Sequence, residues 1–291
     1  MPVNLTVYGQ TDVGLVRPKN EDAFVIADIT GGTLVREPQI CRFEVGERGV
    51  LLAVSDGMGG EQAGEVASAL VVESLQRSFA TQPGPAPDDA LMKKAVASAN
   101  REVWQAAHQS GREKMGATLT AVYIHGPVAH IAEVGDSRAF LLRAGVIQQV
   151  TKDQSYVQVL IDAGAVTAEE AEHSPMKSII LQAMGQNPTV HVALGRLELR
   201  HKDCFVLCSD GLSNKVHTDE VRDVILGARK LDEACARLVE LAKERGGEDN
   251  ITVVVAGVSG DLPPLRPGET IDDTLQVLQE FDAPIPGAEP R

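Results

Sequence analysis

The sequence predicts an α+β protein arranged as a four-layer α/β/β/α sandwich, with two central antiparallel β-sheets flanked by helix pairs. Two observations carry this prediction: strand-like segments come in runs, and helix-like segments come in pairs. A regular alternation of strand and helix, which is typical of a Rossmann-type parallel sheet, is absent from the pattern. Two sheets packed face to face, with the helix pairs outside, fit this order.

The first part of the chain supplies strands and then a helix pair. β-Branched and aromatic residues predict one strand from Val3 and another over residues 21–29, and residues 31–48 read as a turn-rich insertion. The run "GVLLAV" at residues 49–54 is apolar throughout, which predicts a strand covered on both faces. A helical spacing of apolar residues follows over 61–79, and a second helix is expected over 90–109.

The remaining chain repeats this plan. Strands over residues 117–126 and 128–145 are joined by a tight turn at Gly126 and Pro127, which predicts a hairpin. Residues 151–185 are polar and mostly helical in pattern, with Thr167 and Glu170 spaced as a capping box. Strands are expected over 192–211, helices over 218–228 and 231–246, and a last buried strand over 250–258. A folded domain over 1–260 is therefore predicted, followed by a flexible, proline-containing tail over 261–291 with one short helix near 274–281.

Charge and hydropathy exclude several classes of partner. The chain of 291 residues carries 27 basic and 41 acidic side chains, a formal charge of −14, whereas nucleic acid and anionic membranes require a basic surface. No apolar run approaches the roughly 20 residues that span a bilayer, and the first residues lack the features of a secretory signal. We expect a soluble, cytoplasmic monomer whose four cysteines are buried free thiols.

Acidic side chains recur where apolar strands begin or end. Asp56 and Asp210 each follow an apolar run and each precede a glycine, in the shared sequence Ser-Asp-Gly. Asp136 follows another such run, and Asp249 stands just before the last strand. Glu21 and Asp22 open the second strand. These acids are expected to converge at one end of the sandwich.

Converging carboxylates repel one another and raise each other's pKa values unless a cation lies between them. Oxygen ligands of this kind suit Mg²⁺ or Mn²⁺ better than zinc. A single Asp-Gly is usually only a turn, and the acids are too dispersed for an EF-hand loop. The repeated setting of the acids beside strands favours a shared metal site.

The same residues lie in six phrases that resemble the metal-dependent protein serine/threonine phosphatases of the protein phosphatase 2C family, in its compact bacterial form. The phrases occur in family order across most of the chain: "GLVRPKNEDAF", "VSDGMGG", "MGATLTAV", "VGDSR", "CSDGL" and "GGEDNITVVV". The resemblance implies hydrolysis of phosphoserine and phosphothreonine in proteins, in opposition to a bacterial Ser/Thr kinase. It also implies a two-metal centre of Mn²⁺ or Mg²⁺, with a third, weaker ion possible.

The resemblance assigns a role to each candidate residue. Asp56 would bridge both metals and the Gly57 carbonyl would bind one of them, while Asp210 and Asp249 would hold the other. Glu21 and Asp22 would bind the metals mostly through bound waters, and Asp136 would form the third metal site together with Asp210. Arg17 would bind the substrate phosphate. Water activated between the two metals would then attack phosphorus directly.

The chain departs from the family pattern at two places. Met58 follows the first Asp-Gly where some relatives have a histidine, so no side-chain acid for the leaving group is assigned. Within residues 151–185, which correspond to the flap of the family, Gln154 replaces a frequent histidine. Two other functions stay open at this point: a phosphatase of small phosphoesters, and a non-catalytic pseudophosphatase that binds without turnover.

Overall fold

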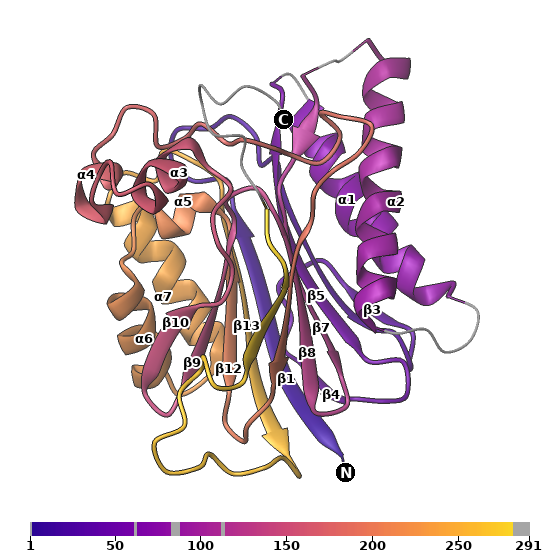
Figure 1. The fold of residues 1–291 in the computed structure, drawn as a ribbon, viewed down its shortest axis with the longest axis vertical. Coiled ribbons are helices and arrows are strands. Elements are labelled where there is room, and N and C mark those ends of the chain that lie inside the picture. The colour runs from indigo at the N-terminus through magenta and orange to yellow at the C-terminus, as the bar shows by residue number, and fades with distance from the viewer. Residues whose placement is uncertain (1, 61–62, 83–87, 112–113, 282–291) are drawn as a thin grey trace.

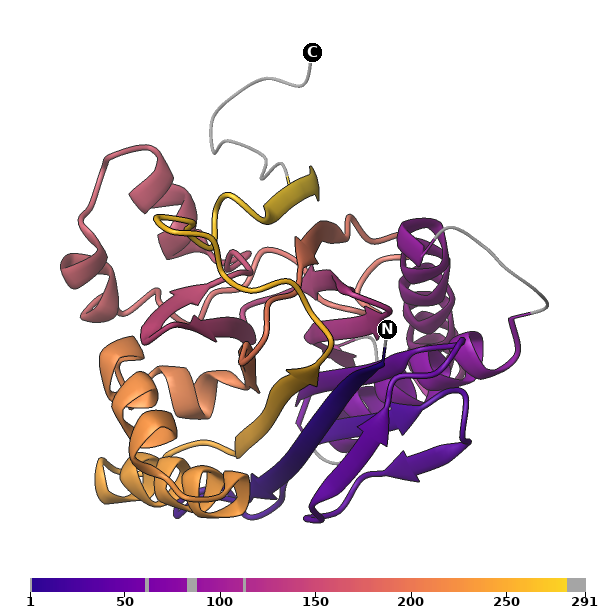
Figure 2. The same ribbon diagram turned by 90° about the horizontal axis from the view of Figure 1, so that it is seen from below.

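Two β-sheets pack face to face, and helices cover the outer face of each (Figure 1, Figure 2). This computed structural model describes residues 2–60, 63–82, 88–111 and 114–281. All strand pairs in both sheets are antiparallel. The predicted four-layer α+β architecture is therefore confirmed.

One sheet has six strands and contains both an early and a late strand of the chain. Its order is β10 (Val146–Gln149), β9 (Arg138–Arg143), β12 (Cys204–Cys208), β13 (Ile251–Gly260), β1 (Val3–Asp12) and β4 (Cys41–Glu44). β1 and β13 pair along their whole length, from Val3 opposite Gly260 to Asp12 opposite Ile251. This pairing brings residues near Gly14 beside those that precede β13.

The other sheet has eight strands. Its order is β14 (Leu275–Gln279), β11 (Ala193–Glu198), β8 (Val128–Val134), β7 (Leu119–His125), β5 (Val50–Met58), β2 (Asp22–Asp28) and β3 (Thr33–Val35), with β6 (Gly116–Ala117) paired to the end of β5. The edge strands of the two sheets, β10 and β14, border one open side of the sandwich.

Seven helices complete the described part of the chain. α1 (Ala63–Ala80) and α2 (Asp88–Gln109) cover the eight-stranded sheet, and α6 (Thr218–Gly227) and α7 (Leu231–Glu244) cover the six-stranded sheet (Figure 1). The short helices α3 (Tyr156–Asp162), α4 (Ala168–Glu172) and α5 (Asp210–Ser213) lie at one end of the sheets. Residues 61–62 of the first predicted helix lie outside the described residues.

Three apolar layers hold the sandwich together. The central layer lies between the sheets and includes Phe24, Leu52 and Phe205, which are at most 2% exposed. A second layer joins α1 and α2 to one sheet, and a third joins α6 and α7 to the other. Burying a large apolar side chain contributes about 1.5–3 kcal/mol, so these layers fix the strand ends that carry the acids. Cys41, Cys204, Cys208 and Cys235 are free and buried in these layers, as predicted.

Two details differ from the sequence prediction. The strand expected over 128–145 is two strands, because Gly135 has φ +105° and turns the chain from β8 in one sheet to β9 in the other. Residues 151–185 contain only the short helices α3 and α4, although the capping box at Thr167 is confirmed. No helix within the described ranges is long and apolar enough to span a membrane.

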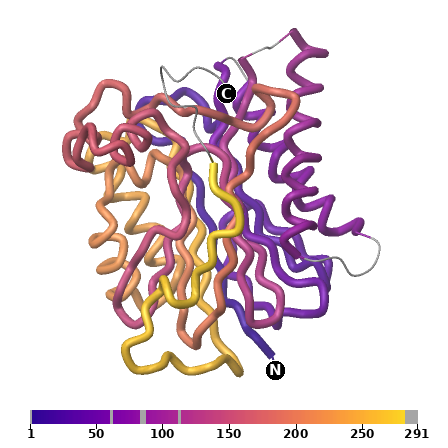
Figure 3. The backbone as a smooth tube through the Cα atoms, viewed as in Figure 1, coloured from indigo at the N-terminus to yellow at the C-terminus, as the bar shows by residue number. Residues whose placement is uncertain are grey.

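The predicted tail is the largest correction. Residues 261–281 run along the open side of the sandwich (Figure 3), and β14 forms there in place of the expected helix. β14 pairs with β11, and Leu262 and Ile271 are buried against the central core, which anchors the segment. Residues 282–291 of the predicted flexible tail lie outside the described residues.

Candidate metal centre

The predicted acids meet at one end of the sandwich, although they come from five separate segments. Asp22 on β2 lies directly opposite Asp56 on β5 in the antiparallel register. Asp210 begins α5 just after β12, and Asp249 precedes β13. Both of these strands belong to the six-stranded sheet. A cavity of about 560 Å³ is lined by most of the candidate residues: Arg17, Glu21, Asp56, Gly57, Asp136, Asp210 and Asp249. Asp22 is the one candidate that does not line it.

Asp22 instead joins the two sheets behind this cavity. Its Oδ2 accepts hydrogen bonds from Ser209 Oγ at 2.7 Å and Thr252 Oγ1 at 2.6 Å, both from the six-stranded side. Its Oδ1 is buried and has no hydrogen-bond partner among the described residues. The carboxylate is therefore held firmly on one oxygen and left available on the other.

The acids strongly perturb one another. Burial raises the pKa of Asp22 to about 7 and that of Asp136 to about 8, and repulsion from Asp210 adds to both shifts. Burial, with repulsion from Asp22 and Asp210, raises the pKa of Asp56 well above its usual value. Burial followed by repulsion from Asp249 raises the pKa of Asp210. Arg138 lowers the pKa values of Asp136 and Asp210, but burial and mutual repulsion outweigh it, and a cation placed among these carboxylates would stabilise their charged forms.

Divalent cations fit this donor set. Asp210 Oδ1 is a second buried carboxylate oxygen without a partner in the described structure, alongside Asp22 Oδ1. A buried, unpaired carboxylate oxygen is costly, and a hard cation is the partner that it suits. Across the described ranges, no three acidic, histidine or cysteine side chains already form a metal-binding cluster. The fit therefore rests on oxygen chemistry and on these two unsatisfied atoms.

Arg17 places a positive charge at the rim of the cavity. Its Nη2 lies 2.7 Å from Asp249 Oδ2, and about half of its side chain is exposed. The hydrogen bond to Asp249 raises the pKa of Arg17, so the guanidinium stays charged. An exposed planar fork beside an acidic cavity is suited to binding a phosphate that enters it.

The glycines that follow Asp56 and Asp210 permit close backbone packing. A Cβ on Gly57 would lie 2.1 Å from the carbonyl oxygen of Gly64 in α1, and a Cβ on Gly211 would lie 2.0 Å from the carbonyl oxygen of Asn250. Real side chains do not tolerate such distances. Both Asp-Gly sequences are therefore fixed by packing at this site, and neither is only a surface turn.

Several supporting residues were not predicted. Asn250 accepts a hydrogen bond from Glu21 N at 2.7 Å and donates to the carbonyls of Val13 and Lys19, each at 2.9 Å, which fixes the loop that carries Arg17. Thr118 Oγ1 accepts from Asp56 N at 2.9 Å. The sequence signal for these roles was position alone: Asn250 directly follows Asp249, and Thr118 lies in the phrase "MGATLTAV".

The segment 151–185 borders the same cavity. Ser178 and Ile180 contribute to its lining. A neighbouring cavity of about 470 Å³ shares Asp136 and Asp210 with it and is lined by His173 and Lys177, both of which are exposed. Residues of the segment 151–185 thus lie beside the acids, and the assignment of this segment as a flap, which the resemblance implied, stays a prediction.

Comparison with known proteins gives a consistent assignment. The sequence model described as Protein phosphatase 2C matches residues 40–252. The serine/threonine protein phosphatase PstP of Mycobacterium tuberculosis is 38% identical over 280 residues, which cover 94% of this chain and 49% of that protein. The serine/threonine phosphatase stp of Listeria monocytogenes is 33% identical over 250 residues, which cover 84% of this chain and 93% of that protein.

Solved structures agree with this assignment. The crystal structure of M. tuberculosis PstP gives a TM-score of 0.75 at 36% identity, covering 88% of this chain and all of that chain. The PstP catalytic domain in complex with two manganese ions gives a TM-score of 0.74 at 36% identity, over 89% of this chain and all of that one. The chain spans about half the length of full PstP. On this sequence match and these relatives, the chain belongs to the protein phosphatase 2C family.

Proposed function

We propose that this chain removes phosphate from phosphoserine and phosphothreonine in proteins at a two-metal centre. The observation that carries the proposal is the single cavity that gathers Asp56, Asp136, Asp210 and Asp249 beside the exposed guanidinium of Arg17. The relatives are named serine/threonine phosphatases, and one of them is known with two manganese ions, which supports the same chemistry here.

The proposed ligands follow the positions of the acids. Asp56 and the Gly57 carbonyl would hold one Mn²⁺ or Mg²⁺ ion, and Asp56 with Asp210 and Asp249 would hold the other. Glu21 and Asp22 would contribute through bound waters, and Asp136 with Asp210 would hold a third, weaker ion. When bound, the ions supply a nucleophilic water at neutral pH and neutralise charge on the phosphoryl oxygens.

The chain's own residues orient this centre and its substrate. Thr118 fixes the backbone of Asp56, and Asn250 fixes the loop of Glu21 and Arg17. Arg17 would offer its exposed guanidinium to two phosphoryl oxygens and orient the phosphate for in-line attack. Met58 stands beside the cavity and has no proton to donate to the leaving oxygen.

We further propose that the chain acts as a monomeric catalytic unit and opposes a Ser/Thr kinase. The test is phosphate release from a phosphothreonine peptide with Mn²⁺ and with chelator. We expect turnover that chelator abolishes and that Asp249→Asn removes, while the exposed Asp261→Asn serves as the matched control. A higher kcat/KM for a nucleotide or sugar phosphate than for phosphopeptide would refute the protein substrate, and no turnover at saturating Mn²⁺ would refute catalysis.

A further inference from the structure

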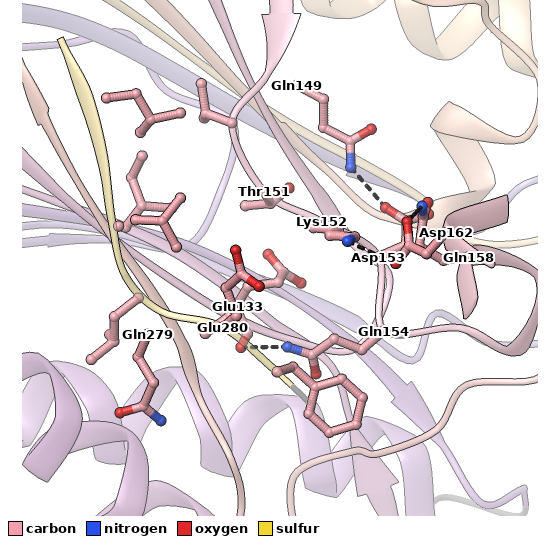
Figure 4. Close-up of a pocket in the computed structure, with 18 of the residues that line it drawn as sticks. Glu133, Gln149, Thr151, Lys152, Asp153, Gln154, Gln158, Asp162, Gln279 and Glu280 are labelled. Carbon is pink, nitrogen blue, oxygen red and sulfur yellow. Dashed lines mark hydrogen bonds and ion pairs between the residues drawn. The ribbon is translucent and has the colours of Figure 1, made fainter. Parts of the chain in front are cut away.

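A second cavity, of about 230 Å³, lies on the open side of the sandwich and contains none of the proposed metal ligands (Figure 4). β8 and β11 form its floor, β14 forms one wall, and residues 149–154 with α3 form the other. Much of its lining is apolar: Ile131, Val150, Val159, Leu181, Leu275 and Val277. The cavity therefore exists because β14 adds a wall that the rest of the sandwich lacks.

One buried carboxyl group enters this apolar space. Glu133 on β8 is 2% exposed and lines the cavity (Figure 4). Its Oε2 accepts a hydrogen bond from Thr120 Oγ1 at 2.7 Å. Its Oε1 is buried and has no hydrogen-bond partner among the residues that the structure describes. A buried carboxyl oxygen of this kind is costly unless something binds it.

The charged side chains that line the cavity are mostly acidic, so a cation would complement them. Lys152 is paired with Asp162 at 2.7 Å, and Asp153 is paired with Arg138, which approaches from outside the cavity. Glu280 adds a further acid to the lining. The lining thus has more acidic than basic groups, and its one lysine already has a partner.

We propose that this cavity binds a small organic amine, whose ammonium group hydrogen-bonds to Glu133 Oε1 and whose apolar body packs between β8, β11 and β14. The volume supports this size, because a cavity of about 150 Å³ holds a benzene molecule. A single ring with an aminomethyl group therefore fits the roughly 230 Å³ available.

Two further observations support the site. Burial first, and then repulsion from Asp153 and Asp136, raises the pKa of Glu133 well above its usual value, and a bound cation would oppose both effects. Gln154 links the site to the segment 151–185, since its Nε2 donates to the carbonyl of Glu133 at 3.1 Å and its Oε1 accepts from Gln182 Nε2 at 2.7 Å. A bound amine therefore contacts the base of the segment that borders the metal centre.

The test is titration of the metal-free protein with benzylamine, benzyl alcohol and benzoate, followed by calorimetry and by protein NMR shifts. The three probes share one ring and differ in charge. We expect benzylamine to bind at least about 10-fold more tightly than benzyl alcohol, since charged hydrogen bonds are the stronger ones, and benzoate not to bind. Equal affinity for the three probes, or no binding of benzylamine to the folded protein, would overturn the proposal.

Two variants locate the binding. Glu133→Gln keeps an acceptor for Thr120 but removes the charge, and we expect a loss of at least about 10-fold in benzylamine affinity. Gly195→Leu fills the cavity from β11, where a new Cβ would meet no atom closer than 3.7 Å, and should block the probe without changing the melting temperature greatly. Asp249→Asn should bind benzylamine like the wild type. Unchanged binding in both cavity variants would place the probe elsewhere and contradict the proposal.

Discussion

Ser55-Asp56-Gly57 and Ser209-Asp210-Gly211 have the same sequence but different backbone courses. β5 continues through the first segment to Met58, with Asp56 paired to β2 and Gly57 paired to β6. β12 ends at Cys208, and α5 begins at Asp210. Asp56 is therefore held by strands on both sides, whereas Asp210 stands where a strand changes into a helix.

The two serines differ as well. Ser55 Oγ donates to the carbonyl of Thr118 at 2.6 Å, within its own sheet. Ser209 Oγ donates to Asp22 Oδ2 and accepts from Thr252 N at 3.0 Å, so it connects the two sheets. The first segment thus fixes the proposed ligand Asp56 within one sheet, while the second segment aligns the other sheet against it. Four measurements test this difference between the two segments.

The largest expected effect is on turnover. Asp56→Asn and Asp210→Asn should each lower metal-dependent phosphate release by more than about 100-fold, because even outer partners of metal ligands cost 10–100-fold when removed. Both variants should be at least as stable as the wild type without metal, because each removes a repelling carboxyl group. Activity assays and melting curves, with Asp261→Asn as control, check both statements; wild-type turnover in either variant would contradict the ligand assignment.

The next effect is on stability, through the two glycines. Gly57→Ala and Gly211→Ala should each cost about 1–3 kcal/mol or more, because the added methyl group meets a backbone carbonyl near 2 Å. Gly227→Ala is the matched control, since a Cβ there meets nothing within 4 Å. Denaturant unfolding measures the three free energies. A neutral Gly211→Ala would show that the strand-to-helix junction yields where the continuous strand does not.

A smaller effect, on Mn²⁺ affinity, should distinguish Ser209 from Ser55. Ser209→Ala should weaken Mn²⁺ binding by roughly 10-fold. The substitution removes one of the two hydrogen bonds to Asp22 Oδ2 and leaves Thr252 N without its acceptor. Ser55→Ala should lower stability by about 1 kcal/mol and leave Mn²⁺ affinity unchanged. Calorimetric titration with Mn²⁺ compares them, and equal affinities in the two variants would remove the distinction between the segments.

The smallest effect is a pH dependence of the metal-free protein. Asp22, whose pKa is raised to about 7, keeps a proton in the folded state that the unfolded chain loses near pH 4. The free energy of unfolding therefore falls as pH rises from about 4 to 7. Above about pH 7, Asp22 should cause no further decrease. Melting temperatures in chelator at pH 5 and pH 8 should differ less for Asp22→Asn than for the wild type; equal differences would show that Asp22 is not the source.

The sequence allowed the layers and the acids to be predicted, because apolar periodicity shows strands and each acid directly flanks one. It could not show that the apolar pattern over 128–145 changes sheets at Gly135, since both strands are buried and read alike. β14 was missed because its backbone bonds come from β11, about 80 residues away. Asn250, Ser209 and Thr252 were missed for the same reason: their partners lie in distant segments.

The pairing of β1 with β13 has a consequence for how the chain matures. The two strands lie about 240 residues apart in sequence, and every residue of β1 is matched to one in β13. During synthesis β1 cannot pair with β13 until β13 has been translated. Asp249 is translated just before β13. A nascent chain that ends before Asp249 therefore has neither a closed six-stranded sheet nor all of the proposed ligands, so we expect ion binding only after residues 249–260 have been translated.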